Sequence, residues 1–391
     1  MTWGLGAIAA AYAVVALAAG ADRGAVNTSA LAGVLPSALA PNARMAQVRD
    51  ALARRDGPAA VKLARASILD APLDARRLSA YGVALGLTGN SAKGYDAFLL
   101  AGQMGWRDPA TQIFWMQAAL DLGDAPVAAM RLDGLLRTRP QMADQAELTG
   151  AFDTNANFGD ALIARMQAKP EWISAYVGST RLLEGDRLNS RVALLERMAG
   201  TGLKVGCEQI AQVVDPLTRR GMFDAAFGLW RSHCDDRPAG LIMDGEFAAY
   251  NPAYEETLPF RWRVPASGDL NVSEEPQKSG GKLLEMRNVS PTPMVAASQL
   301  AMIGGGQYRL TWLARDTTGR ASVSMVPRLW CADAKQVDAQ DRTLLPDGRW
   351  QAVFKVSDQS CSAWSLQFTL QPTSYPVTFG SVTMARDGVG R

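Results

Sequence analysis

Arginine, threonine and glutamine side chains recur at alternate positions of apolar runs in the last third of the chain. They are Arg261, Arg263, Arg309, Thr311 and Gln367. Guanidinium, amide and hydroxyl groups donate hydrogen bonds of the kind that sugar hydroxyls and carboxylates accept. If the strands that carry them are neighbours, these side chains form one polar sheet face, which predicts a glycan-binding surface. The alternative is an ordinary solvated sheet face.

Aromatic side chains in the same runs occupy the opposite phase. They alternate in register with aliphatic residues, as in Tyr308, Leu310 and Trp312 or in Trp364, Leu366 and Phe368. Residues that share a phase with aliphatics face the core, so we expect these rings to be structural. The aromatics best placed to stack on a ligand lie instead in stretches that resemble loops: Tyr250, Tyr254 and Tyr375.

No set of residues suggests a catalytic centre. The chain has a single histidine, His233, which leaves no plausible Ser/His/Asp arrangement. The triplet Gly304–Gly306 precedes an expected strand rather than a helix, so it is not a phosphate-binding loop. We expect a protein that is not an enzyme; the alternative is a glycan-active hydrolase or lyase with two loop carboxylates, such as Glu246 and Asp269.

Four cysteines fall into two local pairs, Cys207 with Cys234 and Cys331 with Cys361. The first pair would begin one helix and end its antiparallel neighbour, and the second would lie at the ends of two β-runs. We predict two disulfides and an oxidising compartment. The alternative is four inert thiols in a cytosolic protein. Neither pair has C-x-x-C spacing, so we expect no cysteine metal site.

The hydrophobic period changes near residue 237 from about 3.6 to 2. Apolar and polar residues then alternate over residues 260–264, 308–314, 350–356 and 364–370, with turn-forming glycine and proline between the runs. About 150 residues with eight to ten such strands predict an antiparallel β-sandwich of the jelly-roll type over residues 237–391.

Three segments of this region, residues 241–247, 259–264 and 308–315, resemble the jelly-roll carbohydrate-binding modules with a galactose-binding-like fold, and the resemblance covers about residues 238–391. It implies a glycan ligand. It also implies a structural calcium ion near Asp244 or Glu246; Asp387 only loosely matches the acidic partner expected near the end of the chain, so calcium stays unassigned. We expect no other cofactor.

The elements before this region are helices that recur with a period of 34 residues. Gly89 and Gly123 are equivalent positions of this repeat, as are Gly94 and Ala128. One period earlier, Arg55 is equivalent to Gly89 and Ala60 to Gly94. Small residues at a helix crossing and proline after the second helix predict stacked helical hairpins over residues 45–69, 76–104 and 109–139. Looser helical periodicity continues over residues 158–167, 172–183, 190–199, 208–219 and 223–232.

This array is similar to the tetratricopeptide repeat (TPR) family over about residues 44–235, with the best match at residues 44–140. Arg44, Leu78 and Gln112 replace the usual tryptophan of the first helix. The resemblance implies an α-solenoid over residues 43–236 that docks a partner protein. The fold class is therefore multidomain, all-α followed by all-β.

The segment from Trp3 to Gly20 has no charged residue and would cover roughly 27 Å as a helix at ~1.5 Å per residue. We expect residues 1–21 to be an uncleaved membrane anchor and residues 22–42 a linker. The alternatives are a cleaved secretory signal, for which the alanine-rich end offers cleavage sites, and a buried first helix of the array.

The chain of 391 residues carries 40 basic and 38 acidic residues, so no net field attracts nucleic acid. Together these features predict an exported binding and assembly protein, anchored in the inner membrane with its bulk in the periplasm. Its repeats would dock a protein and its jelly roll a glycan, which by resemblance suits envelope or exopolysaccharide assembly. The alternative is a structural assembly module with no sugar ligand.

Overall fold

The structure is a computed structural model that describes residues 2–24, 40–234, 238–239, 241–251, 260–265, 268–278, 280–331, 336–357, 361 and 363–387. It divides into two compact units, Met1–Ala175 and Tyr176–Arg391. The first unit is helical, and the second combines the last helices with the β-sheets. The predicted boundary between residues 236 and 237 lies at residues outside the described part.

The first unit consists of helical hairpins, as predicted. Its elements are α1 (Thr2–Gly24), α2 (Pro41–Ala53), α3 (Gly57–Asp70), α4 (Ala75–Leu87), α5 (Ser91–Gln103), α6 (Pro109–Asp121), α7 (Ala125–Thr138), the 3₁₀ helix η3 (Pro140–Asp144), α8 (Ala146–Thr154) and α9 (Ala156–Met166). The first three hairpins are α2/α3, α4/α5 and α6/α7. Sequence periodicity did not predict η3 or α8, which occupy a short, irregular stretch after the third hairpin.

The 34-residue register has a direct structural basis. Arg55, Gly89 and Gly123 each follow the first helix of a hairpin and have φ of 56°, 78° and 74°, the left-handed conformation that ends a helix. At Gly94 the two helices of a hairpin cross so closely that a Cβ would lie 3.1 Å from the carbonyl oxygen of Gly82. Small residues therefore recur because the backbones approach one another.

Helix α1 continues past the predicted anchor and includes Asp22, placed in the linker by the sequence. The buried Asp22 carboxylate accepts hydrogen bonds from the backbone N–H groups of Asn42 (3.0 Å) and Ala43 (2.9 Å) at the start of α2. Within the described residues, none of the helices has both the length and the apolar character that crossing a membrane requires. The anchor stays a prediction.

The second unit begins with the last helices of the array: α10 (Ile173–Gly178, which spans the unit boundary), the 3₁₀ helix η4 (Ser179–Leu182), α11 (Gly185–Gly200), α12 (Cys207–Arg219) and α13 (Phe223–His233). Helices α12 and α13 form the hairpin predicted from the sequence. We expected His233 to be an incidental exposed residue, but it is buried, with Nε2 3.1 Å from the carbonyl oxygen of Leu195.

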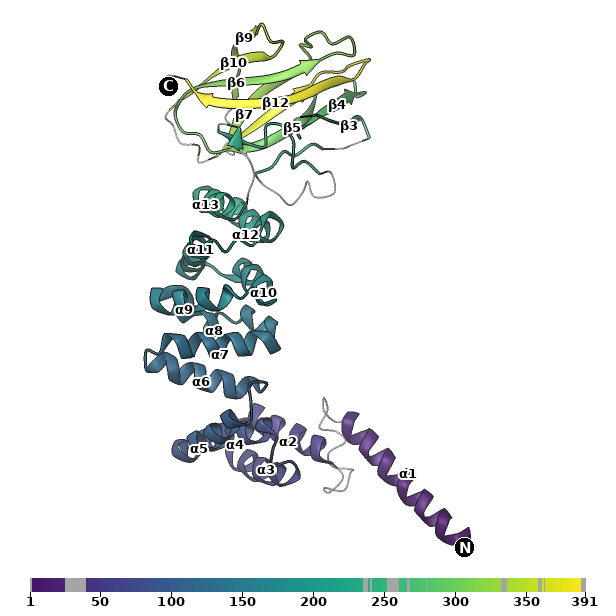
Figure 1. Cartoon of the computed structure of the whole chain (residues 1–391), viewed down its shortest axis with the longest axis vertical. Coiled ribbons are helices and arrows are strands. Elements are labelled where there is room, and N and C mark those ends of the chain that lie inside the picture. Colours follow the sequence, from purple (N-terminus) through teal and green to yellow (C-terminus); the bar gives the residue numbers. More distant parts are fainter. Residues whose placement is uncertain are drawn as a thin grey trace. The chain divides into compact units, whose positions relative to one another are not determined.

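Two antiparallel sheets form the predicted β-sandwich (Figure 1). The six-stranded sheet has the order β3 (Leu270–Pro276), β4 (Lys282–Asn288), β12 (Val377–Arg386), β6 (Gly306–Arg315), β10 (Trp350–Val356) and β9 (Gln340–Leu344). The four-stranded sheet has the order β5 (Met294–Ala301), β11 (Trp364–Leu370), β7 (Met325–Cys331) and β8 (Gln336–Asp338). A small pair, β1 (Pro238–Ala239) and β2 (Ile242–Met243), precedes them.

The apolar phases of the two sheets meet in one core. Trp312 on β6 lies 5.8 Å from Phe368 on β11, ring centroid to ring centroid, and Phe368 lies 4.7 Å from Phe379 on β12. These three rings are fully buried, which confirms the inward phase predicted for Trp312 and Phe368. Trp350 on β10 is in phase with the buried Ala352 and Phe354, yet it is only half-buried near the edge strand β9.

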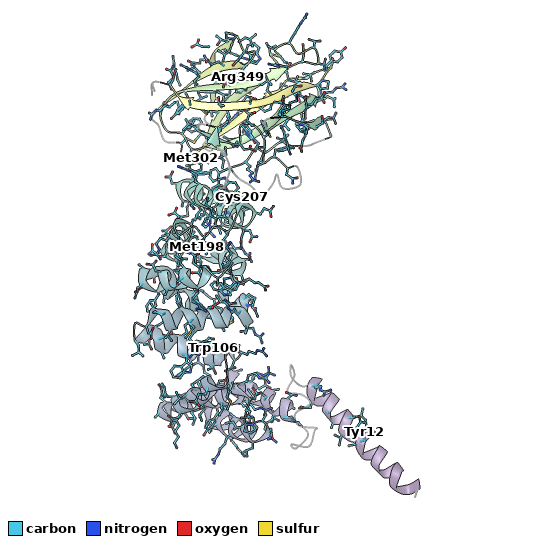
Figure 2. The ribbon with its side chains drawn as sticks, viewed as in Figure 1. Tyr12, Trp106, Met198, Cys207, Met302 and Arg349 are labelled. Atoms are coloured by element: carbon cyan, nitrogen blue, oxygen red, sulfur yellow. A yellow bond between two sulfur atoms is a disulfide. The ribbon has the colours of Figure 1, made fainter. Side chains whose placement is uncertain are left out.

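One predicted disulfide, Cys331–Cys361, is present and joins the end of β7 to the segment before β11. Cys207 is half-buried at the first residue of α12 (Figure 2), and Cys234 is buried directly after α13. These are the hairpin positions that the sequence predicted, and the disulfide between them stays a prediction.

Candidate ligand-binding site

The sandwich separates the predicted polar residues onto two opposite faces. Arg309 and Thr311 belong to β6 of the six-stranded sheet, whereas Gln367 belongs to β11 of the four-stranded sheet. Because the apolar sides of the sheets face each other, the polar sides of β6 and β11 point in opposite directions. The sequence predicted one polar face on the condition that β6 and β11 are neighbours. They belong to different sheets, so this single face does not form.

On the six-stranded sheet, the polar side chains interact with each other. The Arg309 guanidinium forms an ion pair with Asp387 at 2.5 Å, and the Gln307 amide donates to the same carboxylate at 2.9 Å. The Thr311 and Thr383 hydroxyls share a hydrogen bond. Asp387, the loosely matched calcium ligand, thus binds Arg309, so these polar side chains are engaged with one another.

The segment Phe260–Val264 extends the opposite sheet. It was predicted as a regular strand, but among the described residues it forms only an isolated bridge, in which Arg263 and Ser298 of β5 exchange backbone hydrogen bonds of 2.7 and 2.8 Å. Trp262 and Val264 are buried in the sandwich core. The alternation therefore directs Arg261 and Arg263 away from the core.

The last helical hairpin packs beside this segment. Phe260 is buried, with its ring centroid 5.2 Å from that of Phe227 and 6.0 Å from that of Trp230, both on α13. The Arg261 guanidinium lies 5.9 Å from the Trp230 ring centroid. These aromatic contacts hold α13 against the segment that borders β5 at the edge of the four-stranded sheet.

A pocket of about 280 Å³ lies between this hairpin and the sheet. It combines helix residues with strand residues: Asp215, Thr218, Arg219, Phe223, Arg261, Arg263, Ser298, Gln299, Leu300 and Ser365. The structure thus brings the predicted Arg261 and Arg263 together with the polar phase of β11, through Ser365. Gln367 lies two residues further along β11 and donates to the Ser365 hydroxyl at 3.3 Å.

The helix side of the pocket was not predicted as part of a site. Periodicity places Asp215, Arg219 and Phe223 on helices, but it does not show which hairpin face meets the sheet. Arg219 forms an exposed ion pair with Asp215 at 2.6 Å, one helical turn apart. The described lining therefore carries three arginines and one aspartate, which makes it cationic.

Gln299 has a structural role despite lining the pocket. Its buried amide accepts a hydrogen bond from the backbone N–H of Met243 and donates one to the Met243 carbonyl, both at 2.8 Å. This exchange ties β2 to β5 as a backbone pair would. The other polar side chains of the lining carry hydroxyl, guanidinium and carboxylate groups.

The loop tyrosines differ from the sequence expectation. Tyr250 is only 6% exposed and packs edge-on against Phe247, with the ring centroids 6.4 Å apart, so it belongs to the core rather than to a stacking platform. Its loop folds inward because a large apolar ring is more stable away from water. Tyr254 lies outside the described residues, and Tyr375 is exposed.

Asp244, suggested as a calcium ligand, caps a turn. Its carboxylate accepts hydrogen bonds from the backbone N–H groups of Ala248 (2.7 Å) and Ala249 (2.9 Å), and its φ is 49°. Its carbonyl accepts a hydrogen bond from the Trp262 indole at 3.1 Å. Across the described part of the chain, no three His, Cys, Asp or Glu side chains group as metal ligands.

Comparisons with known proteins give no family. No family model matches the sequence, and no curated protein matches it. Among solved structures, a Bacteroides thetaiotaomicron protein provisionally described as sugar-binding is 13% identical, with 38% of this chain and all of that chain covered and a TM-score of 0.28.

Two further solved structures are similar over about a third of this chain. The module TmCBM61, solved with β-1,4-galactotriose, is 11% identical and covers 34% of this chain and 94% of its own, with a TM-score of 0.24. The CBM22-1–GH10 modules of the Clostridium thermocellum xylanase Xyn10B, solved with xylohexaose, are 14% identical and cover 32% of this chain and 26% of their own, with a TM-score of 0.23.

Proposed function

We propose that this protein is an exported, membrane-anchored binding and assembly factor. Its β-sandwich, together with the α12/α13 hairpin, binds glycan, and its TPR-like helical array docks a partner protein. Envelope or exopolysaccharide assembly is the process that suits such a combination. The observation that carries the proposal is the pocket that Arg219, Phe223, Arg261, Arg263 and Ser365 line.

The composition of the pocket favours a sugar. A pyranose ring has apolar faces and a rim of hydroxyls, and the lining offers Phe223 and Leu300 as apolar surface beside guanidinium and hydroxyl groups. Its volume of about 280 Å³ is near the lower end of the range for small-molecule sites, roughly 300 Å³. A short segment of a polysaccharide would fit, with the rest of the chain in solvent.

We propose binding rather than catalysis at this pocket. Glycoside cleavage commonly uses two carboxyl groups roughly 5–9.5 Å apart across the scissile bond. Asp215 is the single carboxylate among the described lining residues, and it is ion-paired with Arg219. The lining thus resembles a recognition site more than a hydrolytic one.

The partner-docking proposal rests on exposed apolar side chains in the first unit. Leu73, Met104 and Trp106 surround a cavity of about 510 Å³ where the α3–α4 and α5–α6 connections meet (Figure 2 labels Trp106). Leu73 is 85% exposed and Trp106 is 45% exposed. Apolar groups gathered at a cavity favour protein docking over random surface exposure.

Export is supported by the Cys331–Cys361 disulfide and by the uncharged segment Trp3–Gly20. Disulfides persist in oxidising compartments, which suits a periplasmic location of the bulk of the chain. Fractionation of the native host tests this proposal. Recovery of the full-size chain in the soluble cytoplasm would overturn it.

A glycan array screened with the intact chain tests the binding proposal. We expect retention of a restricted set of glycans by the wild type and loss of that signal for Phe223→Ala, because the ring supplies apolar surface to the sugar. Leu122→Ala, a change at an exposed apolar residue of the first unit that does not line the pocket, serves as the control. If the wild type retains no glycan, the structural assembly module becomes the better interpretation.

A further inference from the structure

We propose that the cavity where the α3–α4 and α5–α6 connections meet binds an acidic segment of a partner protein, with a large apolar side chain of that segment inserted beside Leu73 and Trp106. This inference rests on the proposed docking function and names the chemistry of the partner. Apolar side chains supply the contact area, and unpaired cations beside Trp106 supply the preference for acidic residues.

The apolar part of the lining comes from both connections. Leu73 belongs to the α3–α4 connection and is 85% exposed, whereas Met104 and Trp106 belong to the α5–α6 connection and are 38% and 45% exposed. These side chains surround a cavity of about 510 Å³ (Figure 2 labels Trp106). An inserted leucine or aromatic side chain would remove apolar surface of both partners from water, which is the main source of binding free energy at such a site.

The two carboxylates of the described lining are engaged within this chain. Asp74 accepts hydrogen bonds from the Arg76 guanidinium at 2.9 and 2.8 Å and from the Arg76 backbone N–H at 3.1 Å. Asp108 is buried, and one of its oxygens accepts hydrogen bonds from the backbone N–H and the hydroxyl of Thr111. Each aspartate caps the helix that follows it, α4 or α6. Neither carboxylate therefore lacks a donor of its own.

Two cations beside Trp106 have no such partner. Arg107 lines the cavity and is exposed, and within the described part of the chain its guanidinium forms no ion pair and no hydrogen bond. The guanidinium carbon of Arg131 lies 4.1 Å from the Trp106 ring centroid, and this guanidinium donates to the Gln112 amide oxygen at 3.4 Å. Among the described residues, Nε of Arg131 and Nε2 of the fully buried Gln112 have no hydrogen-bond partner. Unpaired positive charge thus gathers beside the ring.

The two cations would act in different ways. Because Arg107 is exposed and unpaired, it can form a charge-assisted hydrogen bond with an acidic side chain of the bound segment. Arg131 needs no direct contact with the segment, because an uncompensated charge attracts an anion at a distance that salt limits. A basic segment would instead place like charges together. The arrangement therefore attracts acidic partners and repels basic ones.

Fluorescence anisotropy of labelled peptides with the intact chain tests the partner chemistry. The probes are short peptides with a central leucine, phenylalanine or tryptophan, flanked by glutamates, by glutamines or by lysines. We expect glutamate-flanked peptides to bind about tenfold or more tightly than glutamine-flanked ones and lysine-flanked ones to bind most weakly, with differences that shrink as the salt concentration rises. Leu73→Ser should weaken binding of every class with an unchanged melting temperature, because this side chain is exposed.

A charge reversal tests the role of Arg107 itself. Arg107→Glu should remove the preference for glutamate-flanked peptides and favour lysine-flanked ones. Lys93→Glu on α5 makes the same change of charge at an exposed residue that does not line the cavity, so it is the matched control and should keep the wild-type preference. An unchanged preference in Arg107→Glu would overturn the inference.

The outcomes separate the inference from the docking function on which it rests. Equal binding of the three peptide classes, still sensitive to Leu73→Ser, would overturn the acidic preference and leave docking at this cavity intact. Binding that is insensitive to Leu73→Ser would place the peptides elsewhere and overturn the assignment of the cavity. Absence of binding by every peptide would overturn both proposals together.

Discussion

His233, the only histidine of the chain, is held neutral inside the helical part of the second unit. Burial lowers its pKa below the usual 6.5, the hydrogen bond to the Leu195 carbonyl opposes this shift, and nearby Lys204 adds to it. The backbone N–H of Val205 donates to Nδ1 at 3.4 Å, which places the proton on Nε2. Protonation of Nδ1 would break that bond and place a cation in the core.

A lowered folded-state pKa predicts the direction of the pH dependence. The unfolded chain binds the proton more tightly, so the stability that neutral His233 contributes is complete above about pH 6.5 and is lost as the pH falls from there toward the folded pKa. We expect the free energy of unfolding to fall with a slope of up to ~1.4 kcal/mol per pH unit in this window. Chemical denaturation of the wild type and His233→Gln from pH 7.5 to 5 measures it; equal slopes in the two proteins would contradict the assignment.

At single positions, the alternation of apolar and polar residues in the sequence predicted which strand residues are buried in the core. Trp312 and Phe368 were assigned to the core because their phase contains only apolar residues, and both are fully buried. Tyr250 and His233 could not be assigned in this way. Their burial depends on how an irregular loop and a helix end fold onto distant parts of the chain, and no periodic pattern records that.

Helix α2 shows how an element can depend on a residue far from it in sequence. Its N-cap residue, Ala40, has no side chain able to accept a hydrogen bond, and Asp22 supplies the acceptor from α1. We expect Asp22→Ala to lower the free energy of unfolding by about 1 kcal/mol, the usual value of an N-cap. The adjacent exposed Arg23→Ala should have almost no effect, and equal losses would contradict a capping role.

The α12/α13 hairpin carries a second prediction at this scale. Cys207 and Cys234 lie at the start of α12 and just after α13, and a disulfide between them would close a loop of about 27 residues. In the chain-entropy model such a bond stabilises by roughly 3 kcal/mol. Peptide mapping without reductant, on protein purified from the periplasm, should recover Cys207 and Cys234 in one linked pair. Recovery of both as unmodified thiols would contradict the prediction.

The boundaries of elements with strong hydrophobic periodicity were predicted to within a few residues. Those of elements with weak periodicity were not. The three hairpins of the first unit follow the register of Gly89 and Gly123, whose backbone conformation makes the repeat visible in the sequence. The expected helix over residues 172–183 is instead divided into α10 and η4. The segment Phe260–Val264 alternates like a strand yet forms a single bridge, because it lies at a sheet edge.

For the molecule as a whole, the sequence could not show which strands share a sheet. Strands β6 and β11 have nearly identical patterns, and their assignment to opposite sheets depends on contacts between residues far apart in the chain. The polar residues predicted as one surface are consequently divided, with Arg261 and Arg263 in a pocket and Arg309 in an ion pair. The sequence also does not show that the α12/α13 hairpin lines the pocket, because this too depends on contacts between residues far apart in the chain.

Substitutions of outward-facing and of core residues should have different effects, so a loss of binding can be distinguished from a loss of folding. Arg263 and Arg309 are both outward-facing, and substitution of such residues usually changes stability by less than about 0.5 kcal/mol. Trp312→Ala should instead cost roughly 3–5 kcal/mol, because it leaves a cavity in the core. A loss of binding without a change in melting temperature therefore identifies a contact with the ligand.

The most direct measurement compares Arg263→Ala with Arg309→Ala by calorimetric titration of the intact chain with a glycan that the wild type binds, beside thermal melting curves. We expect Arg263→Ala to weaken binding about tenfold or more with an unchanged melting temperature, and Arg309→Ala to bind as the wild type does. Wild-type affinity in Arg263→Ala together with lost affinity in Arg309→Ala would place the site on the opposite sheet and contradict the assignment of the pocket.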